Sequence, residues 1–221
     1  GVIHVGDGDN RVLLGGTGST VSSGSGNDTV TNAGSYSSIS AGDGNNLITS
    51  GEHSTIRSGA GDDSITVGGW YSAIFAGDGD NRILVTSSYN STVTVGGGDD
   101  LVSLNSTGGN VIYVGNGDNT VISAGTNTVT AGGGNDFVSI SGGVILVGDG
   151  NNRVSLGGTT STVSTGGGND TLKANSNGVY VTDFTKGTQK SATDPSFKAG
   201  DILDFTDTDA PEITDGVLSA E

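Results

Sequence analysis

The chain has 221 residues, of which 42 are glycine and 2 are proline, and 31% are hydrophobic; this composition excludes a Pro-rich linker and a core of packed helices. The formal net charge is −16, which would repel nucleic acid and anionic lipid, so we expect no nucleic-acid partner. There is no cysteine for disulfides and no apolar run of about 18 residues for membrane insertion.

The chain begins with Gly1-Val2-Ile3-His4-Val5, which lacks the basic and long apolar regions of a signal peptide. Ile3 and Val5 already occupy the aliphatic positions that precede each later glycine-rich phrase. We therefore expect the sequence to be part of a longer chain.

A short phrase then recurs ten times: a glycine, any residue, a second glycine, two Asp or Asn residues, and an aliphatic residue two places on. The phrase starts at Gly6, Gly24, Gly42, Gly59, Gly77, Gly96, Gly115, Gly132, Gly148 and Gly166. A nearly constant period of about 18 residues indicates stacked structural repeats.

Each period divides into two halves, and each half carries one main aliphatic residue between polar ones. The first halves carry Val12, Val30, Ile48, Ile65, Ile83, Val102, Val121, Val138, Val154 and Leu172. The second halves carry Val21, Ile39, Ile56, Ile74, Val93, Ile112, Val129, Ile145 and Val163. The β-branched bias favours short strands that stack in parallel. The sequence predicts an all-β fold, a right-handed parallel β-roll or β-helix solenoid of about ten coils.

The second turn of each period differs from the first, because Ser or Asn stands where the acidic residue would be. These residues are Ser19, Ser37, Ser54, Ser72, Ser91, Asn110, Asn127 and Ser161. Carboxylates are therefore expected along one class of turn only. Stacking such turns about 4.8 Å apart places acidic side chains over one another, which requires a cation between them. Carboxylate and glycine carbonyl oxygens suit calcium better than zinc or magnesium.

The phrase resembles the nonapeptide G-G-x-G-x-D-x-U-x of RTX proteins, a calcium-binding parallel β-roll. The motif's Asp corresponds to Asp28, Asp63, Asp100, Asp136 and Asp170. The other turns have Asn at that position, namely Asn10, Asn46, Asn81, Asn119 and Asn152. In these turns the residue three places earlier is Asp7, Asp43, Asp78, Asn116 and Asp149. Almost every turn thus keeps one carboxylate, enough for one Ca²⁺ between successive turns.

We predict about 8 to 10 calcium ions, held by these Asp and Asn residues and by turn glycines. The glycines are Gly6, Gly8, Gly24, Gly26, Gly59, Gly61, Gly96, Gly98, Gly132, Gly134, Gly166 and Gly168. Asp78 and Asp149 are expected to reach an ion, whereas Asp80, Asp99 and Asp118 should point to solvent by strand-like alternation.

An alternation between successive periods leaves the coil width open. Before the second-half aliphatic, Thr20, Thr55, Thr92, Thr128 and Thr162 alternate with other residues. Either two 18-residue coils form the repeated unit, or one 36-residue coil holds four strands. The narrow coil is favoured, because one aliphatic residue per nine fills little space and RTX-like rolls are narrow.

The repeat fades from Ala174, which divides the chain into β-roll repeats (1–173), a capping segment (174–205) and a linker or frayed tail (206–221). The capping segment resembles the closing segment of RTX modules, and its Asp201 and Asp204 could bind one further ion.

The resemblance implies a non-enzymatic calcium-binding module of a secreted or surface-displayed bacterial protein, a spacer or adhesin module that folds on extracellular calcium. His4 and His53 lie near no periodic Ser-Asp pair, and there is no nucleophile elbow. A carbohydrate-binding roll is one alternative, for which an aromatic ladder would be needed, but the aromatic residues look scattered. An ice-binding roll is a second alternative, for which the alternating Thr column supplies half of a regular array.

Overall fold

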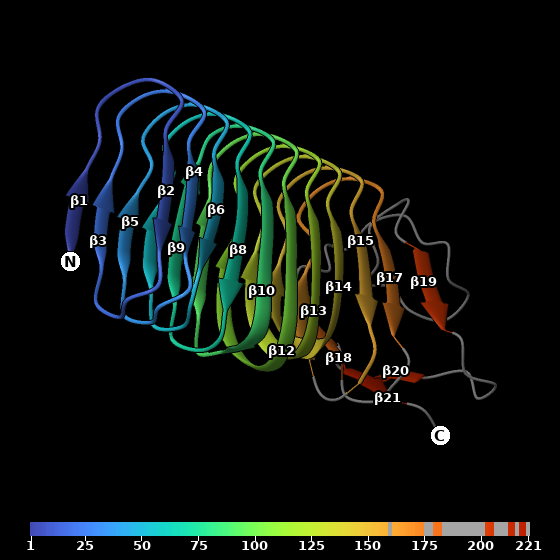
Figure 1. The fold of residues 1–221 in the computed structure, drawn as a ribbon. Coiled ribbons are helices and arrows are strands. Elements are labelled where there is room, and N and C mark those ends of the chain that lie inside the picture. Colours follow the sequence, from blue (N-terminus) through green and yellow to red (C-terminus); the bar gives the residue numbers. More distant parts are fainter. Residues whose placement is uncertain (159–160, 175–178, 183–201, 206–211, 215–216, 220–221) are drawn as a thin grey trace.

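The computed structural model describes residues 1–158, 161–174, 179–182, 202–205, 212–214 and 217–219. In these residues the chain forms strands and turns without a helix, and the strands stack as a parallel β-solenoid of about nine turns (Figure 1). The predicted fold class is confirmed, and the number of turns is close to the expected ten coils. No helix in the described part of the chain is long and apolar enough to span a membrane.

Two sets of strands alternate along the chain, one set in each half of a coil. The strands that follow the glycine-rich phrase are β2 (Arg11–Leu14), β4 (Thr29–Asn32), β6 (Leu47–Ser50), β8 (Ser64–Gly68), β10 (Arg82–Tyr89), β15 (Arg153–Leu156) and β17 (Thr171–Ala174), and β19 (Ile202–Phe205) extends this set by pairing with β17. The strands of the other half are β1 (Val2–His4), β3 (Thr20–Ser22), β5 (Ser38–Ser40), β7 (Thr55–Arg57), β9 (Ala73–Gly77), β11 (Thr92–Val95), β16 (Ser161–Ser164) and β18 (Val179–Val181). Three longer strands run through both halves of the central coils, β12 (Leu101–Tyr113), β13 (Thr120–Thr130) and β14 (Phe137–Leu146).

The strand register sets the width of a coil. Strand β2 pairs in parallel with β4, so that Arg11 lies beside Thr29, and β3 pairs with β5, so that Thr20 lies beside Ser38. Side-chain contacts between neighbouring coils accordingly join residues 16 to 19 positions apart. One coil therefore has about 18 residues and two strands, as in the narrow-coil alternative, and a 36-residue coil is excluded.

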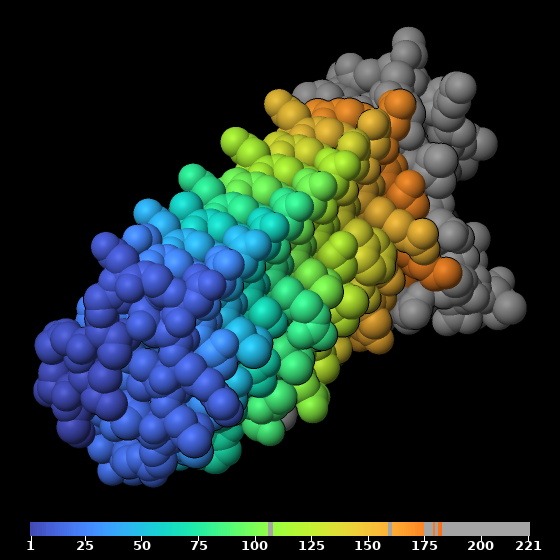
Figure 2. Space-filling view, turned by 45° about the horizontal axis from the view of Figure 1, so that its top comes forward, coloured from blue at the N-terminus to red at the C-terminus, as the bar shows by residue number. Residues whose placement is uncertain are grey.

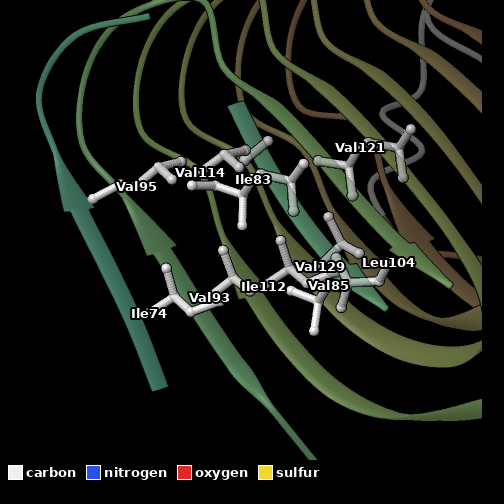
Figure 3. Close-up of a cluster of buried hydrophobic side chains, with 14 of the residues drawn as sticks. Ile74, Ile83, Val85, Val93, Val95, Leu104, Ile112, Val114, Val121 and Val129 are labelled. Atoms are coloured by element: carbon white, nitrogen blue, oxygen red, sulfur yellow. The ribbon is translucent and has the colours of Figure 1, made fainter. Parts of the chain in front are cut away.

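The aliphatic columns face inward, as the sequence predicts. Val30 pairs with Ile48 and Ile39 pairs with Ile56, and all four side chains are fully buried between the two halves of the coil. Figure 3 shows Ile74, Val93, Ile112 and Val129 as one such row in the central coils. Burying an aliphatic side chain of this size contributes about 1.5 to 3 kcal/mol.

A second inward column on each strand changes character along the solenoid. In the N-terminal coils this column includes the buried polar residues Asn32 and Ser50, whereas later coils have Val67, Val85 and Leu104 at the same register. The core is therefore thin in the first coils, where other interactions must hold neighbouring coils together.

Strand pairing changes at the C-terminal end. Strand β18 pairs in parallel with β16 but antiparallel with β21 (Val217–Ser219), which in turn pairs antiparallel with β20 (Glu212–Thr214). Both short strands lie in the segment 206–221 that the sequence assigns to a linker or tail. Asp201 and most of the predicted cap lie outside the described residues, and Asp204 is placed only by the backbone pairing of β19 with β17.

Candidate functional site

The two glycines of each phrase allow successive turns to stack in direct contact. A Cβ added at Gly77 would collide with the carbonyl oxygen of Gly59, and one at Gly79 with that of Gly61. Gly79 also has φ +120°, a conformation that side chains with a Cβ rarely adopt. The glycine carbonyls of one turn therefore lie against the backbone of the next, and no side chain fits between the stacked turns at these positions.

The fifth residue of each phrase points into the solenoid and forms an inner ladder of Asp and Asn side chains. The backbone N–H of Asn46 donates to Oδ1 of Asp63 (2.8 Å), and the N–H of Asp63 donates to Oδ1 of Asn81 (3.1 Å). The members of this inner ladder are Asn10, Asp28, Asn46, Asp63, Asn81, Asp100, Asn119, Asp136, Asn152 and Asp170, with Asp and Asn in strict alternation. Each coil is thus bonded to a side chain of the following coil.

The asparagines of the inner ladder also satisfy the glycine carbonyls of their own turns. Nδ2 of Asn81 donates to the carbonyls of Gly77 (3.2 Å) and Gly79 (2.8 Å). Asn10, Asn46 and Asn119 make the same pair of bonds, and Asn152 donates to Gly148. An Asn-type turn is therefore a self-contained hydrogen-bonded unit.

Four aspartates of the inner ladder have no hydrogen bond at their second side-chain oxygen, the atom that corresponds to the asparagine Nδ2. Oδ2 of Asp28, Asp63, Asp100 and Asp136 is buried and has no hydrogen-bond partner, although each residue is at most 2% exposed. An ionised carboxylate buried with an unpaired oxygen is costly, because the charge loses its hydration without compensation. Each of these Asp-type turns therefore requires a proton or a cation.

The electrostatics of the inner ladder agree with this requirement. Burial raises the pKa of Asp100 to about 6, against the opposing effect of the Asn81 N–H bond. Burial also raises the pKa of Asp63 and of Asp136. Neighbouring outward carboxylates, such as Asp99 beside Asp100, add to the shift. The turns thus disfavour the bare carboxylate and favour its neutralisation.

The fourth residue of each phrase forms a separate outer ladder, exposed to solvent, which the sequence did not reveal. The N–H of Asp99 donates to Oδ1 of Asp80 (2.8 Å), and the N–H of Asp118 donates to Oδ1 of Asp99 (2.8 Å). The members are Asp9, Asn27, Asn45, Asp62, Asp80, Asp99, Asp118, Asn135, Asn151 and Asn169. The exposed positions of Asp80, Asp99 and Asp118 confirm the predicted outward orientation.

The acidic residue expected to compensate in Asn-type turns lies on the outside. Asp78 is exposed, and its Oδ1 accepts a hydrogen bond from the N–H of Gly97 (2.9 Å) in the next coil. Asp149 makes the same bond to Gly167 (2.8 Å), as do Asp7, Asp43 and Asn116 to their next coils. This bond lowers the pKa of Asp7. These side chains already stabilise turn stacking, and their role as calcium ligands stays a prediction.

The second turn of each coil carries a buried ladder of Ser and Asn. The N–H of Ser54 donates to the hydroxyl of Ser72 (3.3 Å), and the N–H of Ser91 donates to Oδ1 of Asn110 (2.9 Å). No carboxylate takes part in these bonds. The expected contrast between an acidic and a neutral class of turn is confirmed.

An aromatic strip, which we define as Tyr36, His53, Tyr71 and Tyr89, runs across four successive second turns. Ring centroids are 4.6 Å apart for Tyr36 and His53, 5.3 Å for His53 and Tyr71, and 6.1 Å for Tyr71 and Tyr89. The aromatic residues looked scattered in the sequence, and for these four that interpretation is wrong, because their rings lie side by side.

The backbone at the strip is strained. Tyr36, His53 and Tyr71 have φ of 58°, 55° and 53°, in the left-handed region that bulky residues avoid. At the equivalent turn position the flanking coils have Gly18 and Asn90, the residue types that this conformation favours. The three aromatic side chains are thus kept at a cost to the backbone, which is a frequent property of functional residues.

The donor set of the Asp-type turns fits a hard divalent cation. It consists of one buried carboxylate oxygen per turn and the adjacent glycine carbonyls, which are the oxygen ligands that calcium prefers. Within the described part of the chain no group of three or more His, Cys, Asp or Glu side chains comes together. Backbone oxygens would therefore supply most of the ligands.

Comparisons of the chain with protein-family models, with curated proteins and with solved structures found no match.

Proposed function

We propose that this chain is a non-enzymatic, calcium-binding structural repeat module of a secreted or surface-displayed bacterial protein. The observation that carries the proposal is the set of buried, unpartnered Oδ2 atoms of Asp28, Asp63, Asp100 and Asp136. The repeated Gly-x-Gly-x-Asp phrase of the chain, which resembles the RTX nonapeptide, supports the same proposal. The elongated solenoid in Figure 2 is a suitable shape for a spacer or scaffold, or for an adhesin module that holds other domains away from a surface.

Calcium would be held by these aspartates together with glycine carbonyls of the same and adjacent turns. When bound, the ion neutralises the buried carboxylates and links neighbouring coils. At about 2 mM calcium, a site with a dissociation constant of about 0.1 mM contributes about 1.8 kcal/mol to stability. A few such sites approach the whole stability of an ordinary domain, which is about 5 to 15 kcal/mol. The module would therefore fold outside the cell, where calcium is abundant.

A calcium titration of the full chain tests the proposal. We expect chelator to lower the thermal midpoint and the β-sheet signal in far-UV circular dichroism, and calcium to restore both. Magnesium at the same concentration should restore much less, because it demands a small octahedral site. An unchanged spectrum and midpoint in excess chelator, with no heat of calcium binding in isothermal titration, would refute the proposal.

The aromatic strip favours a second candidate function, a carbohydrate-binding roll. Tyr36, Tyr71 and Tyr89 are 64%, 52% and 43% exposed, and exposed aromatic groups with polar edges are common in binding surfaces. The test is affinity electrophoresis against soluble polysaccharides. The double variant Tyr36→Gly, Tyr71→Gly keeps the fold because glycine suits the positive φ, and it should lose retardation, whereas Asn90→Gly should not. Equal retardation of both variants would rule out the aromatic strip as a carbohydrate-binding site.

A further inference from the structure

We propose that ion binding in this solenoid is confined to the Asp-type turns, because the side-chain amide of asparagine takes the place of the ion in every other turn. The inference rests on the proposed calcium binding and names the turns at which it occurs. Strict alternation of Asp and Asn along the inner ladder then gives one ion per two coils. The 8 to 10 ions expected from sequence would require an ion in nearly every coil.

The first step is that Asp and Asn occupy the inner ladder in the same way. Oδ1 of Asp63 accepts the N–H of Asn46 at 2.8 Å, and Oδ1 of Asn81 accepts the N–H of Asp63 at 3.1 Å. Because the carboxylate and the amide are planar and of equal size, fixing Oδ1 also fixes the second branch. Oδ2 of an aspartate therefore lies where Nδ2 lies in an asparagine.

The second step concerns what occupies that position in an Asn-type turn. Nδ2 of Asn46 donates to the carbonyls of Gly42 and Gly44 in its own turn, at 3.1 and 2.8 Å, and to the carbonyl of Ser58 in the next coil at 3.1 Å. Asn152 likewise bridges Gly148 and Thr165. In these two turns the amide bridges carbonyl oxygens of neighbouring coils, as a cation would, and in the turns of Asn10, Asn81 and Asn119 it joins the two glycine carbonyls of its own turn.

The third step is that no amide fills this position in an Asp-type turn. Oδ2 of Asp28, Asp100 and Asp136 is buried without a hydrogen-bond partner. The equivalent Nδ2 of an Asn-type turn donates to glycine carbonyls, which are acceptors only. At Asp63 a hydrogen bond from Ser58 opposes, without cancelling, the effect of burial on the pKa. A positive charge placed among these oxygens supplies the attraction that the amide hydrogens supply in the neighbouring coil. The Asn-type turns offer no comparable vacancy for an ion, because their amide nitrogen already fills it.

The fourth step is that the outward carboxylates cannot restore an ion to the Asn-type turns without breaking other bonds. Asp43 and Asp78 are exposed and accept backbone N–H groups of the next coil at 3.0 and 2.9 Å. Alternation also leaves about 9.6 Å between successive ions, twice the strand spacing, which weakens their mutual repulsion.

The test uses Asp→Asn substitutions in the full chain, with calcium chloride as the only added ligand. Isothermal titration should show that Asp100→Asn binds one calcium ion fewer than the wild-type chain. The thermal midpoint of Asp100→Asn in chelator should be higher than that of the wild type by several degrees, because the new amide satisfies the turn. The matched control is Asp99→Asn, which makes the same chemical change on the exposed outer ladder; it should leave the number of bound calcium ions unchanged and shift the midpoint in chelator by less than Asp100→Asn does.

Two further variants complete the test. The quadruple variant Asp28→Asn, Asp63→Asn, Asp100→Asn, Asp136→Asn should fold in chelator and lose most calcium binding, whereas Asn81→Asp should gain one ion and become more sensitive to chelator. A wild-type chain that binds no calcium would overturn both this inference and the proposed function. Calcium binding that survives the quadruple variant, or a lower midpoint of Asp100→Asn in chelator, would overturn this inference alone.

Discussion

Acidification should stabilise the ion-free solenoid, because its buried carboxyl groups bind protons more tightly in the folded chain than in the unfolded chain. Burial raises the pKa of Asp100 from 3.8 to about 6. For such a group the free energy of unfolding is highest below the unfolded-state pKa and falls as the pH rises to the folded-state pKa. In chelator we therefore expect stability to fall between about pH 4 and about pH 6 and to stay low at higher pH.

The size of the effect follows from the same shift. A difference of about two pKa units corresponds to about 3 kcal/mol, and screening by nearby solvent lowers this to about 2 kcal/mol. For a chain of this length, 2 kcal/mol corresponds to a shift of about 4 to 8 °C in thermal midpoint. Protonation of Asp63 and Asp136 on acidification should also raise the thermal midpoint, because burial raises the pKa of both carboxyl groups.

Thermal unfolding of calcium-free protein at about pH 4.5 and about pH 7.5 isolates the contribution of Asp100. The wild-type midpoint should rise on acidification by about 4 to 8 °C more than that of Asp100→Asn, which has no proton to gain at this position. Asp99→Asn should keep most of the wild-type gain, because burial and not the Asp99 charge is the main cause of the shift at Asp100. If Asp100→Asn gained as much as the wild type, or if the wild type lost stability at acid pH, the reasoning about the inner ladder would be refuted.

Two other predictions concern the frame that carries the ladders. Gly79→Ala should lower the free energy of unfolding by more than about 1 kcal/mol, because it combines a positive φ with a collision at the Gly61 carbonyl. Gly157→Ala is the control, because the nearest atom is 4.0 Å from the added carbon, and it should change this free energy little. Chemical denaturation measures both. Ile112→Ala should cost about 2 to 5 kcal/mol because Ile112 is fully buried. The same change at Ile122, which is 44% exposed, should cost less than about 1 kcal/mol, and similar losses at both sites would contradict the assigned core.

The solenoid could be predicted from sequence because its repeating contacts leave a direct trace in the chain. Each strand must bury one aliphatic side chain at a fixed register, so the columns of Val30 and Ile48, or of Ile39 and Ile56, can be found by counting. The alternation between successive coils was harder to interpret, since it is compatible with a wider coil. In the structure every coil has the same two-strand architecture, and what alternates from turn to turn is the inner-ladder residue, which is Asp in one turn and Asn in the next.

Other features depend on local conformations that sequence rules do not assign. The aromatic strip exists because Tyr36, His53 and Tyr71 adopt a left-handed conformation usually left to glycine or asparagine, so turn rules gave no reason to align them. The hydrogen bond of Asp78 was not predicted either. Its carboxylate accepts the N–H of Gly97 in the next coil, a bond that requires the turn stacking to be known first, and its expected role as a calcium ligand stays a prediction.

The two ladders of the acidic turn run in opposite directions, which explains how a solenoid with so thin a core can hold its first coils together. In the inner ladder the N–H of Asp28 donates to the following coil at Asn46, whereas in the outer ladder the N–H of Asn27 donates to the preceding coil at Asp9. Two adjacent residues thus bind each turn to both neighbours, and a buried bond to a neutral amide oxygen such as that of Asn46 contributes about 0.5 to 1.5 kcal/mol. The outer ladder is exposed, so water solvates its carboxylates and it needs no further ligand. The inner ladder is buried, so its carboxylates need a counter-charge, and this difference in burial between adjacent residues is the physical reason why only the inner aspartates would depend on calcium.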